Sequence, residues 1–307
     1  MSYFTLSSIF FLYAWFFLMP ITITAFNEPL IDKKTIPYRT IIKAWRHGES
    51  GANKAKKLSG GGYDCPLTEL NENGQKQAQA LGERLVSQGK LDIIYSSDLS
   101  RAAHTALAVV NAYANKGEIV KINYSKQLRE ILHGEFDFTD VRARTESGIA
   151  RFYAALANDE KQLTANDELY DKYRFWKIHP QALNDSIVPE LIVDVEDYIK
   201  RGEKRPETSY QLWHRIYKEF IGIAQENLGK NVGISMHGAG LTTLIEGLKK
   251  NSEGLYLPPH FITQEIKIND QLIMPAAFRV NNCDVVYFIY DSRGDGTLEL
   301  YNQQTID

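Results

Sequence analysis

The sequence has few cysteines, no excess of basic side chains and no internal repeat. Its 307 residues include 2 cysteines, Cys65 and Cys283, which are too few for a disulfide framework but would allow one bridge in an oxidising compartment. The 35 Lys and Arg residues are outnumbered by 38 Asp and Glu residues, and this balance argues against a nucleic-acid partner. The 7 histidines lack the spacing of zinc ligands, so we expect no metal site.

Charged side chains are also absent from the first 27 residues. The apolar core of this stretch runs from Ile9 to Met19, a length typical of a secretory signal, and Ala25 offers a small residue for cleavage. No Lys or Arg precedes the core, however, and the stretch from Ile9 to Phe26 is just long enough for a membrane anchor. We therefore interpret residues 1–26 as a signal peptide or membrane anchor. We expect an exported protein, periplasmic or secreted, that touches a membrane only through these residues if they stay uncleaved.

From residue 38 onward, short β-branched runs alternate with segments of helical periodicity. This alternation predicts an α/β fold, namely a three-layer α/β/α sandwich around a mainly parallel sheet. The last two runs are joined by an Asp-Gly turn, which predicts an antiparallel C-terminal edge. The expected strands cover residues 40–45, 91–97, 119–124, 282–292 and 297–303, the expected helices cover 67–88, 98–115 and 207–228, and a further strand, turn and helix share 231–248.

Two features of this pattern concern boundaries. Thr68 is the expected N-cap of the helix over 67–88. Residues 139–206 are less regular than the rest, with helical patterns over much of 140–175, and we interpret them as a lid or insertion. The sequence thus predicts a single domain over residues 38–307 with a lid at about 139–206.

Charged and titratable side chains follow four of the predicted strands. Arg46 and His47 end the first, Arg101 follows the second, Glu130 follows the third, and His237 follows the fourth. Because the carboxyl ends of parallel strands meet at one edge of a sheet, we expect these side chains to lie together. Each of them taken alone is explained by a surface charge or a satisfied polar group. Only their repeated placement at strand ends indicates a site.

Two arginines, two histidines and one carboxylate form a coherent set for binding and cleaving a phosphate monoester. Arginine binds phosphate oxygens in pairs and keeps its charge. A neutral imidazole is a competent nucleophile near neutral pH, and a carboxylic acid is suited to protonating a leaving alkoxide. Gly48, directly after His47, would let the backbone approach the phosphate closely.

Longer segments around these residues form an ordered series. They are "RHGES" with Asn53 shortly after it, "YDCPLTELNENGQKQAQALGERL", "IIYSSDLSRAAHTA", "LREILHG", "ETSYQLWHRI" and "ISMHGAGL". In this order they resemble the histidine phosphatase superfamily, the phosphoglycerate-mutase-like proteins, over most of residues 41–245. The ordered series is far more specific than one Arg-His-Gly.

The resemblance implies roles for individual residues. His47 would be phosphorylated during turnover, and Glu130 would be the proton donor, with Glu135 and Asp137 as rivals. The chain departs from the family at Phe138, where the family often has a glycine. The resemblance also implies three side chains that line the phosphate pocket and one near its rim, which are Arg46, Arg101, His237 and Asn53 in that order.

The function implied is that of a phosphomonoesterase of the histidine acid type, without a cofactor, acting on a small phosphorylated substrate or a phosphopeptide. Cofactor-dependent mutases of the family carry "ERHYG" around their acid, whereas this chain has "REILHGEFDF". This difference favours hydrolysis over mutase-type phosphoryl transfer, which is the first alternative. The second alternative is an inactive binding protein of the same fold, and the complete residue set argues against it.

Overall fold

The computed structural model describes residues 36–134, 137–138, 193–204, 206–250, 254, 266–268, 271–274 and 277–301. All of them belong to one unit that spans residues 32–302. Residues 1–26 and most of the predicted lid at 139–206 lie outside the described residues. In the part of the chain that is described, no helix is both long and apolar enough to cross a membrane.

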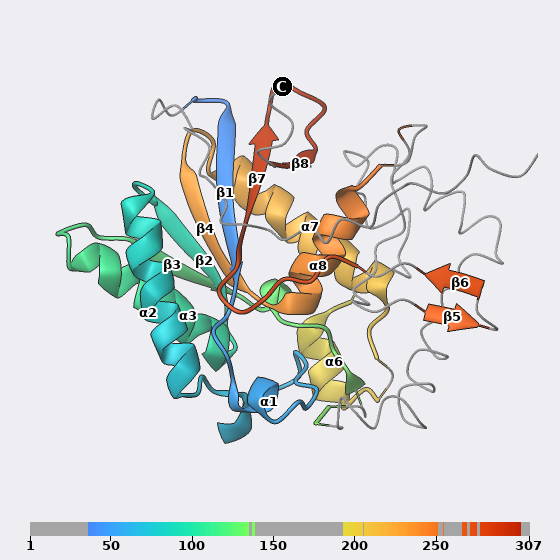
Figure 1. The fold of residues 1–307 in the computed structure, drawn as a ribbon. Helices are drawn as coiled ribbons and strands as arrows, with labels where there is room; N and C mark the ends of the chain where they lie inside the picture. The colour runs from blue at the N-terminus through green and yellow to red at the C-terminus, as the bar shows by residue number, and fades with distance from the viewer. Residues whose placement is uncertain are drawn as a thin grey trace, which may run out of the picture. The chain divides into compact units, whose positions relative to one another are not determined.

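A six-stranded sheet lies at the centre of the fold, in the order β3-β2-β4-β1-β7-β8 (Figure 1). The strands β1 to β4 pair in parallel, whereas β7 pairs antiparallel with both β1 and β8. The predicted mainly parallel sheet with an antiparallel C-terminal edge is therefore confirmed. The strands are β1 (Arg39–Arg46), β2 (Ile93–Ser97), β3 (Lys121–Ser125), β4 (Asn231–Met236), β7 (Val285–Asp291) and β8 (Leu298–Leu300), and a separate pair is formed by β5 (Ile266–Ile268) and β6 (Gln271–Met274).

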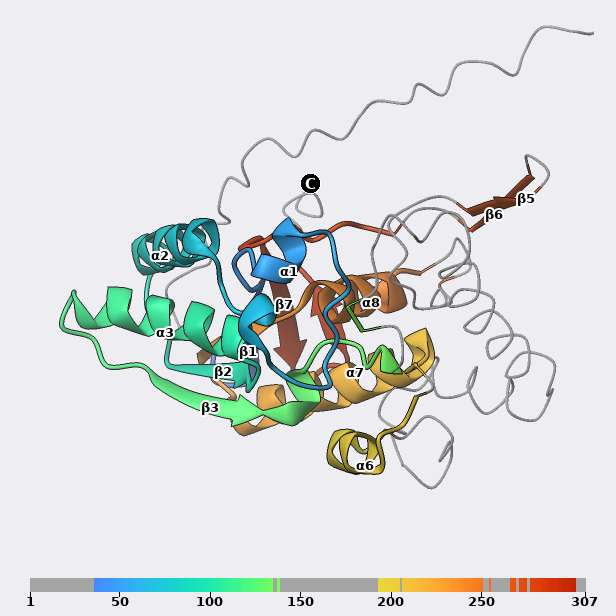
Figure 2. The same cartoon turned by 90° about the horizontal axis from the view of Figure 1, so that it is seen from below.

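Helices cover both faces of the sheet, which confirms the three-layer architecture (Figures 1 and 2). On one face α2 (Glu72–Ser87) and α3 (Ser100–Ala114) pack over a core cluster that includes Trp45. On the other face α7 (Ser209–Glu226) and α8 (Gly238–Leu248) pack over a second cluster that includes Phe288. The short elements are α1 (Gly51–Lys54), η1 (Pro66–Thr68), η2 (Lys126–Leu128) and α6 (Val195–Arg201).

The helix expected over 67–88 begins later than predicted, and the prediction that Thr68 is its N-cap is wrong. Thr68 ends η1, where its hydroxyl accepts a hydrogen bond from the Cys65 amide at 3.0 Å. The N-cap of α2 is Asn71, whose side-chain oxygen accepts a hydrogen bond from the Gly74 amide at 2.8 Å. Thr68 is occupied by the preceding turn, so the next suitable side chain caps the helix instead.

The two cysteines do not form the bridge that the sequence allowed, because both are free thiols. Cys283 is buried in the core cluster around Trp45, beneath α2. Cys65 lies instead in the loop that leads into η1. The two side chains therefore belong to different surroundings, and each is explained by its local packing.

The register of the central strands places the ends of β1 and β4 side by side. Arg46 is paired with Met236, so the next residues of the two strands, His47 and His237, are neighbours. The His47 amide continues the ladder by donating to the Met236 carbonyl at 3.0 Å. Strand pairing alone thus brings two residues that are 190 positions apart to one point of the sheet edge.

Candidate active site

The two histidines at the ends of β1 and β4 form the centre of the site. Their ring centroids are 5.2 Å apart, with the planes inclined at 61°. The side chains are buried, with exposed fractions of 3% for His47 and 0% for His237. The Nε2 atom of His237 lies 2.9 Å from the Ser97 hydroxyl at the end of β2, which ties a third strand end to the pair.

The proton position on His47 follows from one hydrogen bond. Its Nδ1 lies 2.6 Å from the Gly48 carbonyl, and a carbonyl only accepts, so Nδ1 carries the hydrogen. Burial, followed by the positive charges of Arg101 and Arg46, holds the pKa of His47 well below its usual range. The ring is therefore neutral near pH 7, with an unprotonated Nε2 that is suited to nucleophilic attack.

Arg46 lies against the start of α8. Its Nη1 donates to the Val280 carbonyl at 2.8 Å, and burial lowers the pKa of its guanidinium from the usual value. A side chain on Gly238 would place its Cβ 3.1 Å from the Arg46 Nε. The glycine after His237 therefore leaves the space in which the guanidinium lies.

Arg101 lies in the first turn of α3, with an exposed fraction of only 1%. One of its terminal nitrogens, Nη2, donates to the Gly60 carbonyl at 3.1 Å. The other, Nη1, is 3.9 Å from an Asp64 carboxylate oxygen, which is too far for a hydrogen bond. The loop before η1 thus fixes one side of the guanidinium and leaves the other available.

Three buried nitrogens of the site have no hydrogen-bond partner among the described residues. They are Nε of Arg46, Nη1 of Arg101 and Nδ1 of His237. An unmade hydrogen bond at a buried polar atom costs about 1–3 kcal/mol, so such atoms are rare unless a ligand completes them. Two of the three belong to permanent cations, which indicates that the missing ligand is an anion.

Glu130 lies next to this group, in the segment that follows η2. Its Oε2 accepts from the Ala239 amide at 3.3 Å in the first turn of α8, and its Oε1 accepts from the Ile131 amide at 3.0 Å. The positive end of the α8 dipole suits a carboxylate at this position. The structure thus brings the acid and both histidines to the same helix start.

Of the two other residues that the sequence offered as the acid, only one is described by the structure. Glu135 lies outside the described residues. Asp137 is described, and its Oδ1 accepts from the Gly60 amide at 2.6 Å. Burial raises the pKa of Asp137 to about 6. Asp137 therefore joins the loop that holds Arg101 and is a second carboxyl group near the site.

Phe138, the departure from the family pattern, has a backbone φ of 62°. This left-handed conformation favours glycine, which fits the glycine often found there in the family. The Phe138 ring lies 5.5 Å from the ring of Tyr63. The aromatic contact offsets part of the cost of the unfavourable backbone angle.

The contacts of Gly48 and Asn53 lie in the turn that follows His47 and do not include the three unpartnered nitrogens. The Gly48 amide donates to the Thr105 hydroxyl at 3.1 Å, and a Cβ at Gly48 would lie 2.4 Å from the Gly74 carbonyl oxygen. The Asn53 side-chain oxygen accepts from the Ser50 amide at 3.2 Å as part of the capping box of α1. Both residues therefore shape the backbone that carries His47.

Sequence reasoning missed Asn282, which precedes β7. Its side-chain amide donates to the His47 carbonyl at 2.8 Å and to the Asn53 side chain at 3.3 Å. It also missed Ser97 as the partner of His237. Neither residue has a local signal, because each role depends on a strand that pairs across a long sequence separation. Over the described ranges, no group of three or more His, Cys, Asp or Glu residues is arranged to hold a metal ion.

Comparison with known proteins connects this geometry to a family. Residues 42–172 match the sequence profile of the histidine phosphatase superfamily (branch 1). A fructose-2,6-bisphosphatase TIGAR from Xenopus tropicalis is 45% identical over 91 residues, which make up 29% of this chain and 31% of that protein. A 2,3-bisphosphoglycerate-dependent phosphoglycerate mutase from Chlamydia muridarum is 26% identical over 216 residues, which make up 70% of this chain and 86% of that protein.

Two solved structures share the fold. A phosphoglycerate mutase from Bacillus anthracis has a TM-score of 0.51 at 23% identity, covering 87% of this chain and 94% of that one. A phosphoserine phosphatase from Entamoeba histolytica has a TM-score of 0.50 at 19% identity, covering 86% and 95%. At these identities the likeness establishes a common architecture.

Proposed function

Because the chain belongs to the histidine phosphatase superfamily, we propose that it is a phosphomonoesterase that works through a phosphohistidine on His47. The observation that carries this proposal is the set of buried, unpartnered nitrogens next to a neutral imidazole. Two of these nitrogens are arginine donors that would bind phosphate oxygens. The imidazole is buried beside them with its nucleophilic Nε2 unprotonated.

The proposed reaction has two steps. Nε2 of His47 attacks phosphorus, the bond from phosphorus to the ester oxygen breaks, and Glu130 gives a proton to the leaving alkoxide. Water then attacks the phosphohistidine, with Glu130 taking a proton from it, and inorganic phosphate leaves. Arg46, Arg101 and His237 stabilise the charge on the phosphoryl oxygens in both steps. Both steps use side chains of this chain only, with no cofactor.

The substrate is a small phosphorylated molecule in this proposal. The relatives are named for a sugar bisphosphate and for phosphoglycerate, and a structural neighbour is named for phosphoserine. The compounds in these names all contain a phosphoryl group in ester linkage and differ in the molecule that carries it. They therefore support the reaction class, and a phosphopeptide stays an alternative substrate.

Mutase-type phosphoryl transfer is the second candidate function. It is favoured by the Chlamydia muridarum relative, a mutase of which 86% is covered. The segment "REILHGEFDF" around Glu130 argues for hydrolysis, because it lacks the family's mutase stretch. Release of inorganic phosphate from the substrate supports the phosphatase, whereas isomerisation of phosphoglycerate without net release supports the mutase.

The test is a phosphatase screen of the purified protein over a panel of phosphate esters, with H47A as the control. We expect phosphate release and an acid-labile phosphoenzyme in the wild type, and neither in H47A. Release that persists in H47A would overturn the role of His47. Absence of both phosphatase and mutase activity would favour the inactive binding protein.

We further propose that the first residues direct export and are removed. The uncharged start and the apolar core from Ile9 to Met19 support this. Sequencing of the mature N-terminus from the native source should begin near Phe26. A form that starts at Met1 and stays in the cytoplasm would overturn the proposal.

A further inference from the structure

The segment that carries Glu130 has little regular structure of its own. It leaves β3 through the single turn η2 and continues as an irregular stretch to Gly134, where the backbone φ is 57°. A general acid must be held within hydrogen-bond reach of the leaving oxygen. The position of Glu130 therefore depends on what fixes the backbone around it.

Arg215 of α7 holds that backbone by its guanidinium. Nη1 donates to the Gln127 carbonyl at 2.6 Å and to the Arg129 carbonyl at 3.1 Å. Nη2 lies 3.4 Å from the carbonyl of Glu130 itself. One side chain thus contacts three carbonyls over four consecutive residues that end at the proposed acid.

Glu207 holds Arg215 in place and extends the clamp. Its carboxylate accepts from Nε and Nη2 of Arg215 at 2.8 and 2.7 Å, a two-bond pairing. The same carboxylate accepts from the Leu132 amide at 3.1 Å, and the Glu207 amide donates to the Leu132 carbonyl at 2.8 Å. The backbone is therefore held on both sides of Glu130.

This ion pair is completely buried, with side-chain exposed fractions of 1% for Arg215 and 0% for Glu207. Burying two charges costs about as much as their attraction returns, and apolar replacements are often neutral or stabilising. A gain in folding stability is therefore a weak explanation for the presence of this buried ion pair. The planar guanidinium of Arg215 can donate hydrogen bonds to several carbonyls at once, which an apolar side chain cannot do.

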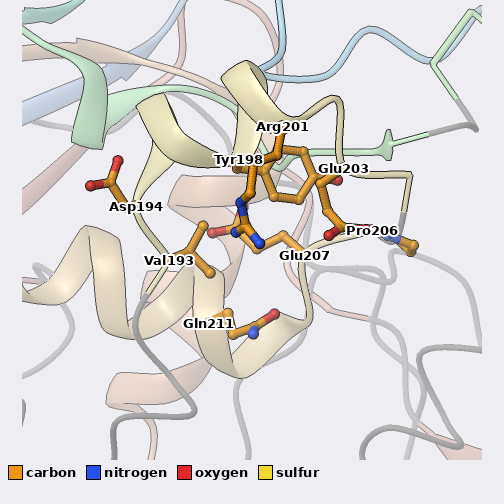
Figure 3. Close-up of a pocket in the computed structure, with 8 residues that line it drawn as sticks. All are labelled: Val193, Asp194, Tyr198, Arg201, Glu203, Pro206, Glu207 and Gln211. Carbon is orange, nitrogen blue, oxygen red and sulfur yellow. The ribbon is translucent and has the colours of Figure 1, made fainter.

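A cavity borders the same segment. It has a volume of about 210 Å³, lies between α6 and the start of α7, and includes Glu207 and Tyr198 among its lining residues (Figure 3). A Cβ on Gly134 would lie 2.1 Å from the Lys204 carbonyl oxygen and 3.0 Å from the Tyr198 hydroxyl, so the turn that ends the segment packs closely against α6 and the residues that follow it. The Glu207 carboxylate, which holds the segment through the Leu132 amide, therefore also lines this cavity.

We propose that Arg215, oriented by Glu207, is a positioning residue that sets Glu130 for proton transfer to the leaving group. This inference rests on the proposed phosphatase function. It goes beyond that function by assigning part of the rate to a residue that touches no substrate. The signature of such a role is a loss that grows as the leaving group becomes poorer, because only a poor leaving group needs the proton.

The test compares R215K with the wild type on p-nitrophenyl phosphate, phenyl phosphate and glycerol phosphate. Lysine keeps the charge that faces Glu207 and loses the fork. We expect kcat to fall by up to about 100-fold on glycerol phosphate, as for an acid displaced by about 1 Å, and by less than about 3-fold on p-nitrophenyl phosphate. The double variant R215K/E130Q should be no slower than E130Q, because the two residues act through one proton.

The matched control is T40V in β1, whose side chain contacts the opposite end of α7 from Arg215. Thr40 is buried, and its hydroxyl donates to the Ala224 and Asn227 carbonyls at 2.6 and 2.9 Å. T40V should lower the free energy of unfolding and leave the ratios of kcat among the three substrates unchanged. If R215K does not fold, as judged by circular dichroism, R215M/E207L removes both charges and is measured in the same way.

Equal losses on all three substrates, or an additive double variant, would overturn the positioning role while leaving the phosphatase function intact. The function itself fails separately, if the wild type releases no phosphate or forms no phosphoenzyme on His47.

Discussion

At the residue scale, each proposed catalytic group has its chemistry set by one or two neighbours. The Gly48 carbonyl fixes the tautomer of His47, and burial, followed by the arginine charges, lowers the pKa of its ring and keeps it neutral. Glu130 is held by the Ala239 amide at the start of α8 and by the Ile131 amide. Neither relation is visible in the motif itself, although both partners lie within or close to motif segments.

The division of labour between His47 and Glu130 is testable by leaving group. General acid catalysis contributes roughly 100- to 10,000-fold, or about 3 to 5 kcal/mol of barrier. E130Q keeps the size and loses the proton, so kcat should fall by that factor on glycerol phosphate and far less on p-nitrophenyl phosphate. The two substrates are compared by steady-state phosphate release.

The rivals of Glu130 supply the control. D137N and E135Q should show no dependence on the leaving group if Glu130 is the acid. A leaving-group-dependent loss in D137N, with E130Q affected equally on both substrates, would move the acid to Asp137. The raised pKa of Asp137, about 6, makes this comparison necessary.

The lowered pKa of His47 predicts how the free protein titrates. The folded-state pKa lies below the unfolded value of about 6.5, so the ring stays neutral as the pH falls past 6.5 and protonates only at lower pH. Its contribution to stability is complete above about pH 6.5 and is lost as the pH falls from there toward the folded pKa. Nitrogen NMR of the His47 ring should show no titration near 6.5, whereas protein in denaturant should titrate there. A native midpoint at or above 6.5 would contradict the assigned burial.

At the element scale, the loop after β1 is fitted to the start of α2 through glycine. Gly48 faces the Gly74 carbonyl, and a Cβ on Gly74 would in turn lie 2.0 Å from the Glu49 carbonyl oxygen. Two backbones therefore approach each other more closely than any side chain allows. The turn that carries His47 is positioned by this contact as much as by its own conformation.

G48A tests that contact. The added Cβ would lie 2.4 Å from the Gly74 oxygen, so the loop must shift, and overpacking of this kind typically costs about 1–3 kcal/mol. The control is G222A within α7, where nothing lies within 4 Å of the new Cβ and alanine should stabilise the helix by up to about 1 kcal/mol. Denaturant unfolding of both variants gives the two free energies. If G48A and G222A changed the free energy of unfolding by similar amounts in the same direction, the close approach of Gly48 to Gly74 would not contribute to stability.

At the scale of the whole molecule, the sheet gathers charge at one edge. The strand ends of β1 and β4 and the starts of α3 and α8 bring two arginines and two histidines to one place. In the proposed function, the guanidinium groups would neutralise phosphate oxygens without a metal ion. Positive charge here comes from the chain itself.

Activity should consequently be independent of divalent ions. Dialysis against a chelator should leave the rate of phosphate release unchanged, since the arginines already supply the charge that a metal would otherwise provide. The dialysed protein with added magnesium or zinc is the comparison. A large loss that is restored by either ion would show that the site has been misassigned.

Most elements of the central sheet, and the residues at their ends, could be predicted from the sequence alone. Local periodicity was enough to place strands at β1, β2 and β4, because side-chain burial repeats within a few residues. It also placed Arg46, His47, Arg101, Glu130 and His237 at strand ends. It misplaced the start of α2, because Thr68 and Asn71 are both residue types that cap helices and the turn of η1 uses the Thr68 hydroxyl.

Which of these ends meet, and which contacts hold them, depends on the order of the strands and on packing far along the chain. The insertion of β4 between β1 and β2 makes His47 and His237 neighbours, and no local pattern encodes strand order. The clamp of Arg215 and Glu207 on the Glu130 segment joins residues that are up to 88 positions apart. Such contacts depend on long-range packing and burial, which a motif read along the chain does not contain. They set the protonation of His47 and the position of Glu130, residues that the motif only names.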